Sequence, residues 1–339
     1  MTVTLADVAD LAKVDRSTVS KVLAGSTSVR VSPETRERIV EAARHLGYRP
    51  NGMARALRTR SSRTLGLVLP RLDNPVFSDM AAGVERAARD RGYSIVISRL
   101  SGASAREGIL QMVTANQVDG VLIISFDSDR ILEEALVGLP VPVVMINRRA
   151  VHGAGYVIHD SFRAAELATR HLIEAGHRRI LHLAGRSDGY NGSQRLAGYR
   201  AALEAAGIAF DESLVLPVGY DPEVAGRMLA EYLAAAPPGG QRPTAIFAAT
   251  LVTAAGALRT LHECGYDLPR EFSVIALNDG LLASLVFPQL TTVALQSPEM
   301  GSRAAAMLID EIEGIRPAHG EVLAAGDVIR RASVAAPFG

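Results

Sequence analysis

Three groups of apolar residues at helical spacing occupy the first fifty positions of the chain. Each group follows residues that suit the start of a helix: Thr4, Asp15 and the pair Ser32-Pro33. The expected buried positions recur every three or four residues, and they are Leu5, Val8, Ala9 and Ala12, then Val19, Val22 and Leu23, then Ile39, Ala42, Ala43 and Leu46. The pattern predicts three short helices, the third of which ends at Gly47.

From position 65 onward, short apolar runs alternate with helical stretches. Strand-like runs cover 65–70, 94–99, 121–125, 141–147, 180–184, 245–249 and 274–278, and helical stretches such as 76–92 and 105–118 lie between them. This alternation is typical of a mostly parallel sheet with helices on both faces. There is enough of it to build two such lobes.

The charges are unevenly divided between these two regions. Residues 1–64 hold 12 lysines and arginines against 6 aspartates and glutamates, whereas residues 65–339 hold 24 against 30. A small basic segment on a larger acidic one indicates a nucleic-acid-binding module joined to a second domain. Both lysines of the chain, Lys13 and Lys21, lie in the basic segment, so the larger region has no lysine for a P-loop or a Schiff base.

Several other classes of protein are disfavoured. No apolar run approaches the length of a membrane span, and the N-terminus has no signal-peptide pattern, so we expect a cytoplasmic protein with no membrane association. The single cysteine, Cys264, is expected to be a small buried residue. The eight histidines show no metal-ligand spacing, and no nucleophile lies near the pair His159-Asp160 in the sequence. We therefore expect no catalytic residue, no metal and no cofactor, and we do not expect an enzyme.

The first two predicted helices, with a turn at Lys13-Val14 between them, have the spacing of a helix-turn-helix unit. In such a unit the second helix enters the major groove of DNA. The spacing alone is only moderately specific. The second helix, however, also carries a set of side chains that can donate hydrogen bonds to base edges or phosphates: Arg16, Ser17, Ser20 and Lys21.

The stretches TLADVADLAKVDRSTVSKVLAG and VSPETRERIVEAARHLGYRPNGMARALRTRSSRTLGLVLP resemble the head, hinge and first strand of the LacI/GalR family of transcription regulators. Further stretches typical of that family follow in the family's order: DNPVFSDMAAGVERAARDRGYS, VDGVLI, RHLIEAGHRRI, QRLAGYRAAL, FSVIALND, PQLTTV and EMGSRAAAML. The resemblance implies a small all-α helix-turn-helix head plus an α/β body. The body would have the two-lobed periplasmic-binding-protein-like fold with mostly parallel sheets.

The resemblance also implies how the chain is divided. Residues 1–50 would form the DNA-binding head, 51–64 a hinge helix and linker, and 65–339 the effector-binding and dimerisation body. Within the body, the N-lobe would comprise about 65–160 plus 291–320, and the C-lobe about 161–290 plus 321–339. No heptad pattern follows the expected last strand at 328–334, so we expect a dimer without a coiled-coil tail.

The implied function is sequence-specific regulation of transcription, as a repressor. A homodimer would bind a palindromic double-stranded operator, and a small-molecule effector, a sugar or sugar derivative, would control that binding. The alternative is a solute-binding protein of a transport system, which the basic head and the absence of a signal-peptide pattern argue against.

Ten residues would contact DNA by this resemblance: Arg16, Ser17, Thr18, Ser20, Lys21, Asn51, Ala54, Arg55, Leu57 and Arg58. Arg16 would read a base or, alternatively, bind a phosphate, whereas Thr18, Ser20 and Lys21 are expected on the DNA backbone. Leu57 would enter the minor groove as an apolar wedge, or instead pack against its dimer mate. Lys13 stands where the family's turn normally has glycine, which costs on the order of 1 kcal/mol if its φ is positive.

The effector would bind in a cleft between the two lobes. The residues that the resemblance places there are Leu72, Asn74, Pro75, Asn147, Arg148, Asn191, Arg195, Asp221, Ala249, Asn278 and Leu295. Arg195 would bind ligand oxygens or, alternatively, form a structural ion pair between the lobes. Asp221 is the only carboxylate expected at the wall. Because Asn147 and Asn278 stand where sugar-binding members often carry aspartate, an anionic effector such as a sugar acid or phosphate is one possibility.

Overall fold

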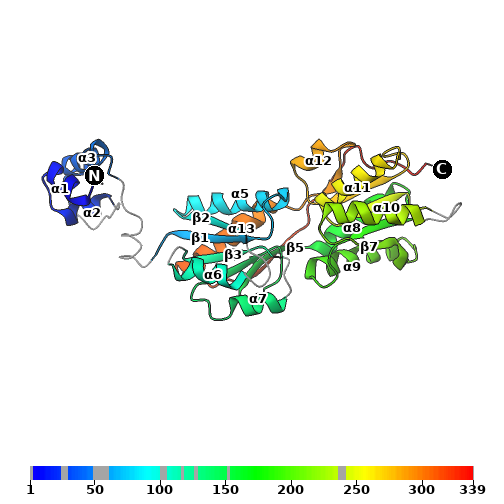
Figure 1. The fold of residues 1–339 in the computed structure, drawn as a ribbon, viewed down its shortest axis with the longest axis horizontal. Coiled ribbons are helices and arrows are strands. Elements are labelled where there is room, and N and C mark those ends of the chain that lie inside the picture. Colours follow the sequence, from blue (N-terminus) through cyan, green and yellow to red (C-terminus); the bar gives the residue numbers. More distant parts are fainter. Residues whose placement is uncertain are drawn as a thin grey trace. The chain divides into compact units, whose positions relative to one another are not determined.

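The computed structural model describes residues 3–23, 30–48, 61–99, 105–115, 118–125, 129–150, 153–235 and 242–338. The chain divides into two compact units, residues 1–62 and 63–339 (Figure 1). None of the helices in the described ranges combines the length and apolar character that a membrane crossing requires.

The first unit contains the three predicted helices, α1 (Leu5–Ala12), α2 (Arg16–Leu23) and α3 (Pro33–His45). Their apolar faces form one small core that includes Val8, Val19 and Ile39, all with no exposed surface. The guanidinium of Arg38 donates from Nε to the carbonyl oxygen of Ala12 at 2.8 Å, which ties α3 to the end of α1. The all-α head is therefore as predicted.

The second unit is built from two mostly parallel sheets with helices on both faces (Figure 1). The first sheet has the order β11-β5-β4-β3-β1-β2, and its strands are β1 (Thr64–Leu69), β2 (Ser94–Arg99), β3 (Gly120–Ile123), β4 (Val143–Ile146), β5 (Gly155–His159) and β11 (Gly320–Leu323). Helices α5 (Pro75–Asp90) and α13 (Ser297–Ile312) cover one face, and α6 (Ala105–Thr114) and α7 (Asp129–Leu136) lie on the other.

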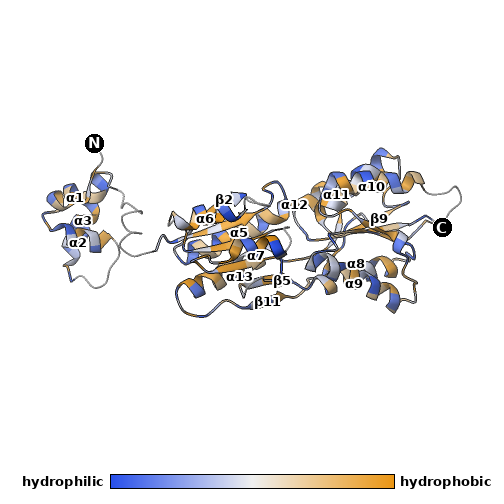
Figure 2. Cartoon of the chain, turned by 60° about the horizontal axis from the view of Figure 1, so that its bottom comes forward, coloured by the Kyte–Doolittle hydropathy of each residue, from blue (hydrophilic) through white to orange (hydrophobic). Residues whose placement is uncertain are grey.

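The second sheet repeats this arrangement with the order β12-β10-β9-β8-β6-β7. Its strands are β6 (Ile180–Ala184), β7 (Val215–Pro217), β8 (Ala245–Ala248), β9 (Ser273–Leu277), β10 (Thr291–Val293) and β12 (Val328–Ile329). Among the described strands, only β12 pairs antiparallel, and its partner is β10. Helices α8 (Ser161–Glu174) and α9 (Tyr190–Ala205) cover one face of this sheet. Helices α10 (Pro222–Ala235), α11 (Leu251–Glu263) and α12 (Leu281–Leu285) cover the other face. The short 3-10 helix η2 (Glu212–Leu214) precedes β7. Figure 2 shows apolar colour concentrated on the strands and inner helix faces.

Two lobe boundaries differ from the prediction. Residues 291–320 were expected in the N-lobe, but β10 pairs with β9 in the second sheet. Residues 321–339 were expected in the C-lobe, but β11 pairs with β5 in the first sheet. The chain therefore crosses between the lobes near 160, 294–296 and 324–327, where the backbone of Ala294 exchanges hydrogen bonds with Gly326 and Asp327. The last strand, at 328–329, is also shorter than the predicted 328–334. Cys264, which was expected to be buried, is exposed and follows the last residue of α11.

Candidate functional sites: the helix-turn-helix face and the inter-lobe cleft

The turn of the head is held by caps at both of its helices. Thr4 and Asp7 form a capping box at the start of α1. Lys13 ends that helix with φ of 52°, the left-handed conformation in which a lysine is strained. Asp15 then accepts hydrogen bonds from the backbone N–H of Thr18 at 2.9 Å and from the Ser17 hydroxyl at 2.6 Å. These bonds hold the pKa of Asp15 far below its usual value, so the cap is charged.

Five of the ten predicted DNA-binding residues lie on α2. Arg16, Ser17 and Lys21 are exposed, and Thr18 and Ser20 are half-buried, while Val19 and Val22 of the same helix face the core. The α2 surface therefore presents two cations and three hydroxyls to solvent. The hydroxyls of Ser17 and Thr18 both donate to Asp15 in this state. The other five predicted residues, Asn51, Ala54, Arg55, Leu57 and Arg58, lie outside the described residues.

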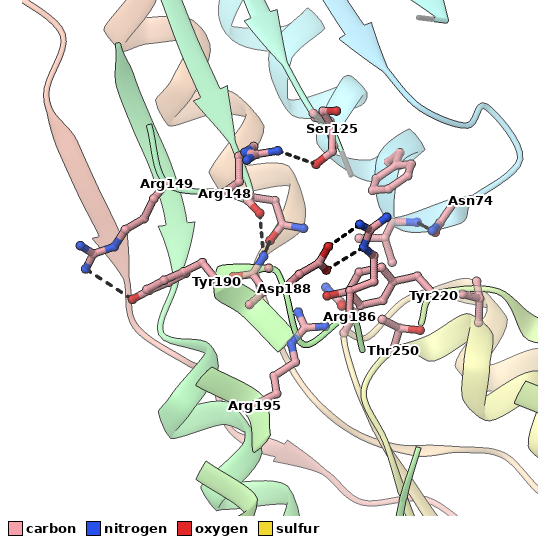
Figure 3. A pocket seen from close by; sticks show the side chains of 18 residues that line it. Asn74, Ser125, Arg148, Arg149, Arg186, Asp188, Tyr190, Arg195, Tyr220 and Thr250 are labelled. Carbon is pink, nitrogen blue, oxygen red and sulfur yellow. Dashed lines mark hydrogen bonds and ion pairs between the residues drawn. The ribbon is translucent and has the colours of Figure 1, made fainter. Parts of the chain in front are cut away.

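In the body, a cleft opens where the carboxyl ends of the strands of both sheets meet, as expected for parallel α/β structures. It encloses about 1010 Å³ of space, part of it open to solvent. Its lining comes from both lobes and consists of Asn74, Val76, Phe77, Ile124, Ser125, Asn147, Arg148 and Arg149 from the first, and Arg186, Asp188, Gly189, Tyr190, Asn191, Arg195, Tyr220, Thr250, Val252 and Asn278 from the second. Figure 3 shows this wall at close range.

Two of the lining asparagines occupy strained positions directly after strands. Asn147 follows β4 with φ of 60°, and Asn278 follows β9 with φ of 71°. Asparagine tolerates this left-handed conformation better than most residues because its short polar side chain can form local hydrogen bonds. The left-handed backbone at these two positions, one in each lobe, therefore itself favours asparagine.

Asn147 and Asn278 also take part in hydrogen bonds between the two lobes. The Asn191 amide nitrogen donates to the backbone oxygen of Asn147 at 2.6 Å and to its side-chain oxygen at 3.1 Å. The Asn278 amide donates to the hydroxyl of Ser297, at the start of α13, at 3.2 Å. Asn74 instead caps α5, accepting from the N–H of Val76 at 3.1 Å. These contacts tie the relative position of the lobes to the polar groups that line the cleft.

Arg195 is the most deeply buried charge of the cleft. It rises from α9 with 3% of its surface exposed, and its Nη1 donates to the carbonyl oxygen of Ala249 at 2.9 Å (Figure 3). Its Nε has no hydrogen-bond partner, and among the described residues no carboxylate lies within ion-pair distance of its guanidinium. Burial lowers the pKa of Arg195 from its usual value. The structural ion pair between lobes, the alternative role for Arg195, is thus not formed among the described residues.

Two histidines lie within electrostatic reach of Arg195. His159, at the end of β5, is 2% exposed, and neither of its ring nitrogens has a partner. Burial, and secondarily the charge of Arg195, lower the pKa of His159 to about 4. His182 stacks on Phe247 in the core, and burial lowers its pKa to about 4 as well. Both imidazoles are therefore neutral near pH 7.

The rim of the cleft carries further arginines. Arg186 pairs with Asp188 at 2.6 Å, and this hydrogen bond lowers the pKa of Asp188. The Arg149 guanidinium lies 4.7 Å from the ring centre of Tyr190 and 3.4 Å from its hydroxyl. Arg148 donates to the backbone oxygen of Ser125 at 3.4 Å. Figure 3 shows these side chains arranged around one opening.

Five of the eleven predicted cleft residues are absent from the lining. Leu72 is 61% exposed, and Pro75 begins α5. Asp221, expected as the one carboxylate of the wall, instead caps α10 and pairs with Arg71 at 3.2 Å. The two remaining residues are buried: the backbone oxygen of Ala249 binds Arg195, and Leu295 packs in the core under β9 and α8. The other six, Asn74, Asn147, Arg148, Asn191, Arg195 and Asn278, all line the cleft.

Asp188, the carboxylate that lines the cleft among the described residues, was missed, together with Arg186 and Tyr190. All three lie between the end of β6 and the first turn of α9, in the segment GRSDGYN. A signal for them exists in the sequence, because this polar glycine-containing segment follows a fully buried strand whose carboxyl end must face the cleft. Tyr220, after β7, follows the same rule.

Known proteins match both units. The model of bacterial regulatory proteins of the lacI family matches residues 4–51, and a periplasmic binding protein-like domain matches 169–334. The HTH-type transcriptional regulator CelR of Thermobifida fusca is 36% identical over 321 residues, covering 92% of each chain. The Ribose operon repressor of Escherichia coli K12 is 33% identical over 316 residues, covering 91% of this chain and 93% of that relative.

Solved structures give the same result. A CelR–cellobiose complex superimposes with a TM-score of 0.74 at 33% identity, covering 98% of this chain and all of that one. The lac repressor dimer bound to operator and the anti-inducer ONPF superimposes with a TM-score of 0.82 at 26% identity, covering 99% of this chain and all of that one. With an all-α head, a two-lobed body and relatives above 30% identity along nine-tenths of its length, this chain belongs to the LacI family of bacterial transcription regulators.

Proposed function

We propose that this protein is a repressor that binds a palindromic operator as a homodimer and is controlled by a sugar or sugar derivative in the inter-lobe cleft. The observation that carries the proposal is the joining of a basic helix-turn-helix head to a body whose polar cleft is lined from both lobes. A ligand there contacts both lobes at once, so its binding energy can favour one lobe arrangement over another. Because the target is chromosomal DNA, we place the protein in the cytoplasm.

Exposed apolar side chains on the body support the homodimer. Leu281 and Leu285 on α12 are 72% and 70% exposed, and Phe287, just after it, is 90% exposed. Val96 and Ile97 on the edge strand β2 are also exposed. Exposed apolar groups on an edge strand of one lobe and on a helix of the other are typical of a protein interface. Light scattering should give a dimer, and a stable tetramer at micromolar concentration would contradict this arrangement.

Operator selection from random duplexes with the full-length protein tests DNA recognition. We expect a palindrome with half-sites about one helical turn apart. Arg16→Ala should relax specificity at one base pair per half-site, at a cost of roughly 1–3 kcal/mol for that pair. An equal loss on every sequence would instead identify Arg16 as a phosphate contact. Leu57→Ala should weaken operator binding while the body stays folded, and unchanged affinity would exclude the wedge role.

The effector part of the proposal is tested by operator release. Titrating mono- and disaccharides and their acids and phosphates into the protein–operator complex should reveal a compound that changes operator affinity in either direction. Substitution of Asn191, which joins the lobes inside the cleft, should change that response while leaving operator binding without effector intact. A compound that acts equally on the isolated head would show that the cleft is not the control site. The competing role, a solute-binding protein, predicts ligand binding without any specific operator.

A further inference from the structure

One carboxylate collects three hydrogen bonds in the first turn of α2. The Ser17 hydroxyl donates to Oδ1 of Asp15 at 2.6 Å, and the Thr18 hydroxyl donates to Oδ2 at 2.6 Å. The backbone N–H of Thr18 also donates to Oδ1, at 2.9 Å, which is the usual bond of a helix N-cap. Because these bonds hold the pKa of Asp15 far below its usual value, the carboxylate is ionised and can only accept.

These bonds limit what the two hydroxyls can do toward DNA. A hydroxyl has one proton and two lone pairs. With its proton held by Asp15, the Ser17 or Thr18 hydroxyl can accept a hydrogen bond but cannot donate a second one. The O···O distances of 2.6 Å are typical of strong, charge-assisted bonds to a carboxylate, so breaking either bond is unfavourable. Phosphate oxygens can only accept, and a phosphate contact through either hydroxyl is therefore disfavoured.

Ser17 is the better placed of the two hydroxyl residues to reach a base. It is exposed beside Arg16, whereas Thr18 is half-buried and Val19 lies in the core. In the major groove the bases present acceptors at N7, O6 and O4, and they present donors only at the amino groups of adenine and cytosine. An exposed oxygen that can accept but not donate therefore matches one of these amino groups.

We propose that Asp15 is a positioning residue for operator recognition. It fixes the Ser17 hydroxyl as an acceptor, and Ser17 then reads the amino group of an adenine or a cytosine in the major groove. The inference rests on the proposed function, since it names the chemical group of the operator that this turn of α2 recognises. A hydroxyl that rotated freely could accept from an amino group or donate to N7, O6 or O4, and would discriminate less between base pairs.

The test removes single groups from the selected operator and measures binding of the full-length protein. Purine in place of adenine, or 2-pyrimidinone in place of cytosine, lacks the amino group, whereas 7-deazaadenine or 7-deazaguanine lacks the N7 acceptor. Each duplex is also bound to Ser17→Ala, which corrects for changes in the DNA itself. At one base pair per half-site, we expect loss of the amino group to weaken wild-type binding by ~10-fold relative to Ser17→Ala, and loss of N7 to weaken it by less than ~2-fold.

Asp15→Asn tests the positioning role. Asparagine caps a helix about as well as aspartate, but a neutral amide holds the two hydroxyl protons more weakly and can itself donate to Ser17. The dependence on the amino group should fall to ~2-fold or less, while the response to analogues at other base pairs stays the same. Asp15→Ser, which also keeps a capping residue, serves as a second variant should Asp15→Asn lower the melting temperature of the head.

Asp10→Asn is the matched control. Asp10 is an exposed aspartate on α1 of the same head, so its replacement removes the same charge without changing the bonds around Ser17. This variant should bind every duplex more tightly by the same factor, because less negative charge faces the phosphates, and it should keep the wild-type dependence on the amino group.

Two results would overturn the inference. The pair at which Ser17→Ala differs from the wild type could depend on N7 rather than on an amino group, or no such pair could exist. Alternatively, Asp15→Asn and Asp15→Ser could keep the full dependence on the amino group, or alter it no more than Asp10→Asn does. In both cases a selected operator leaves the proposed function intact, whereas failure to select any specific operator would refute that function separately.

Discussion

Replacing Arg195 with methionine should stabilise the protein in the absence of effector. Arg195 is 3% exposed and its charge has no carboxylate partner among the described residues. Methionine fills much of the same space with an unbranched apolar side chain and brings no charge into the core of the cleft. The perturbation therefore removes a buried ion while largely preserving the packing of α9 against the second sheet.

The expected size follows from two opposing terms. The substitution loses one charge-assisted hydrogen bond to the buried oxygen of Ala249, which is worth about 1.5–3 kcal/mol. It also removes the cost of keeping a cation out of water, which after relaxation is still several kcal/mol. The desolvation term is the larger one because no described anion offsets it. We expect a net gain in the free energy of unfolding of about 1–3 kcal/mol.

The measurement is urea unfolding of the ligand-free full-length protein, following the transition of the body, with Arg200→Met as control. The control residue is an exposed arginine on the same helix that stacks on Phe210, so its replacement should lower stability by no more than about 1 kcal/mol. Arg195→Met should be more stable than the wild type and should no longer respond to effector. A loss of more than about 2 kcal/mol would refute the reasoning, because it would mean that the free protein already compensates the Arg195 charge.

Three further predictions concern stability. Lys13→Gly should raise the melting temperature of the head by relieving the left-handed φ of 52°, a gain of about 0.5–1 kcal/mol, and a lower melting temperature would contradict this. Gly83→Ala should lower the free energy of unfolding in urea by about 3 kcal/mol, because the added Cβ would overlap the backbone oxygen of Pro298 where α5 and α13 meet. A variant as stable as the wild type would show that the two helices separate easily. His159 and His182 have pKa values of about 4 in the folded protein against about 6.5 when unfolded, so the unfolded chain binds more protons between these values. Stability should be constant above about pH 7 and fall as the pH is lowered, by about 2 kcal/mol per histidine at pH 5, and equal stability at pH 7 and pH 5 would refute both assignments.

Much of the architecture could be predicted because its causes are local. The caps at Thr4 and Ser32 act on N–H groups three residues away, so they can be recognised in the sequence, and the structure confirms both. The strands β3 and β4 coincide with predicted apolar runs, to within one residue at the start of β3, because a strand buried on both faces excludes polar residues. The alternation of such strands with helices then requires a parallel sheet, which the pairing of β1, β3 and β4 confirms.

The cleft was predicted only in part, since its position depends on long-range pairing. Asn147 and Asn278 line it because each follows a strand whose end faces it. Asp188 and Asp221 also both follow strands, and the sequence offers no local means of telling which one faces the opening. In the folded chain Asp221 caps α10 and pairs with Arg71 of the other lobe, whereas Asp188 is the carboxylate that lines the cleft among the described residues.

By itself, then, the amino-acid sequence determined the helices of the head and the strand-and-helix alternation of the body. These follow from spacing, capping and burial, which operate over a few residues. Only the tertiary structure decided that β10 and β11 exchange lobes, and that Arg195 is buried against a carbonyl rather than a carboxylate. The reason is that a short strand pairs wherever a free sheet edge lies within reach. The group that Arg195 meets, the carbonyl oxygen of Ala249, is likewise distant in the sequence and is brought to it only by the fold.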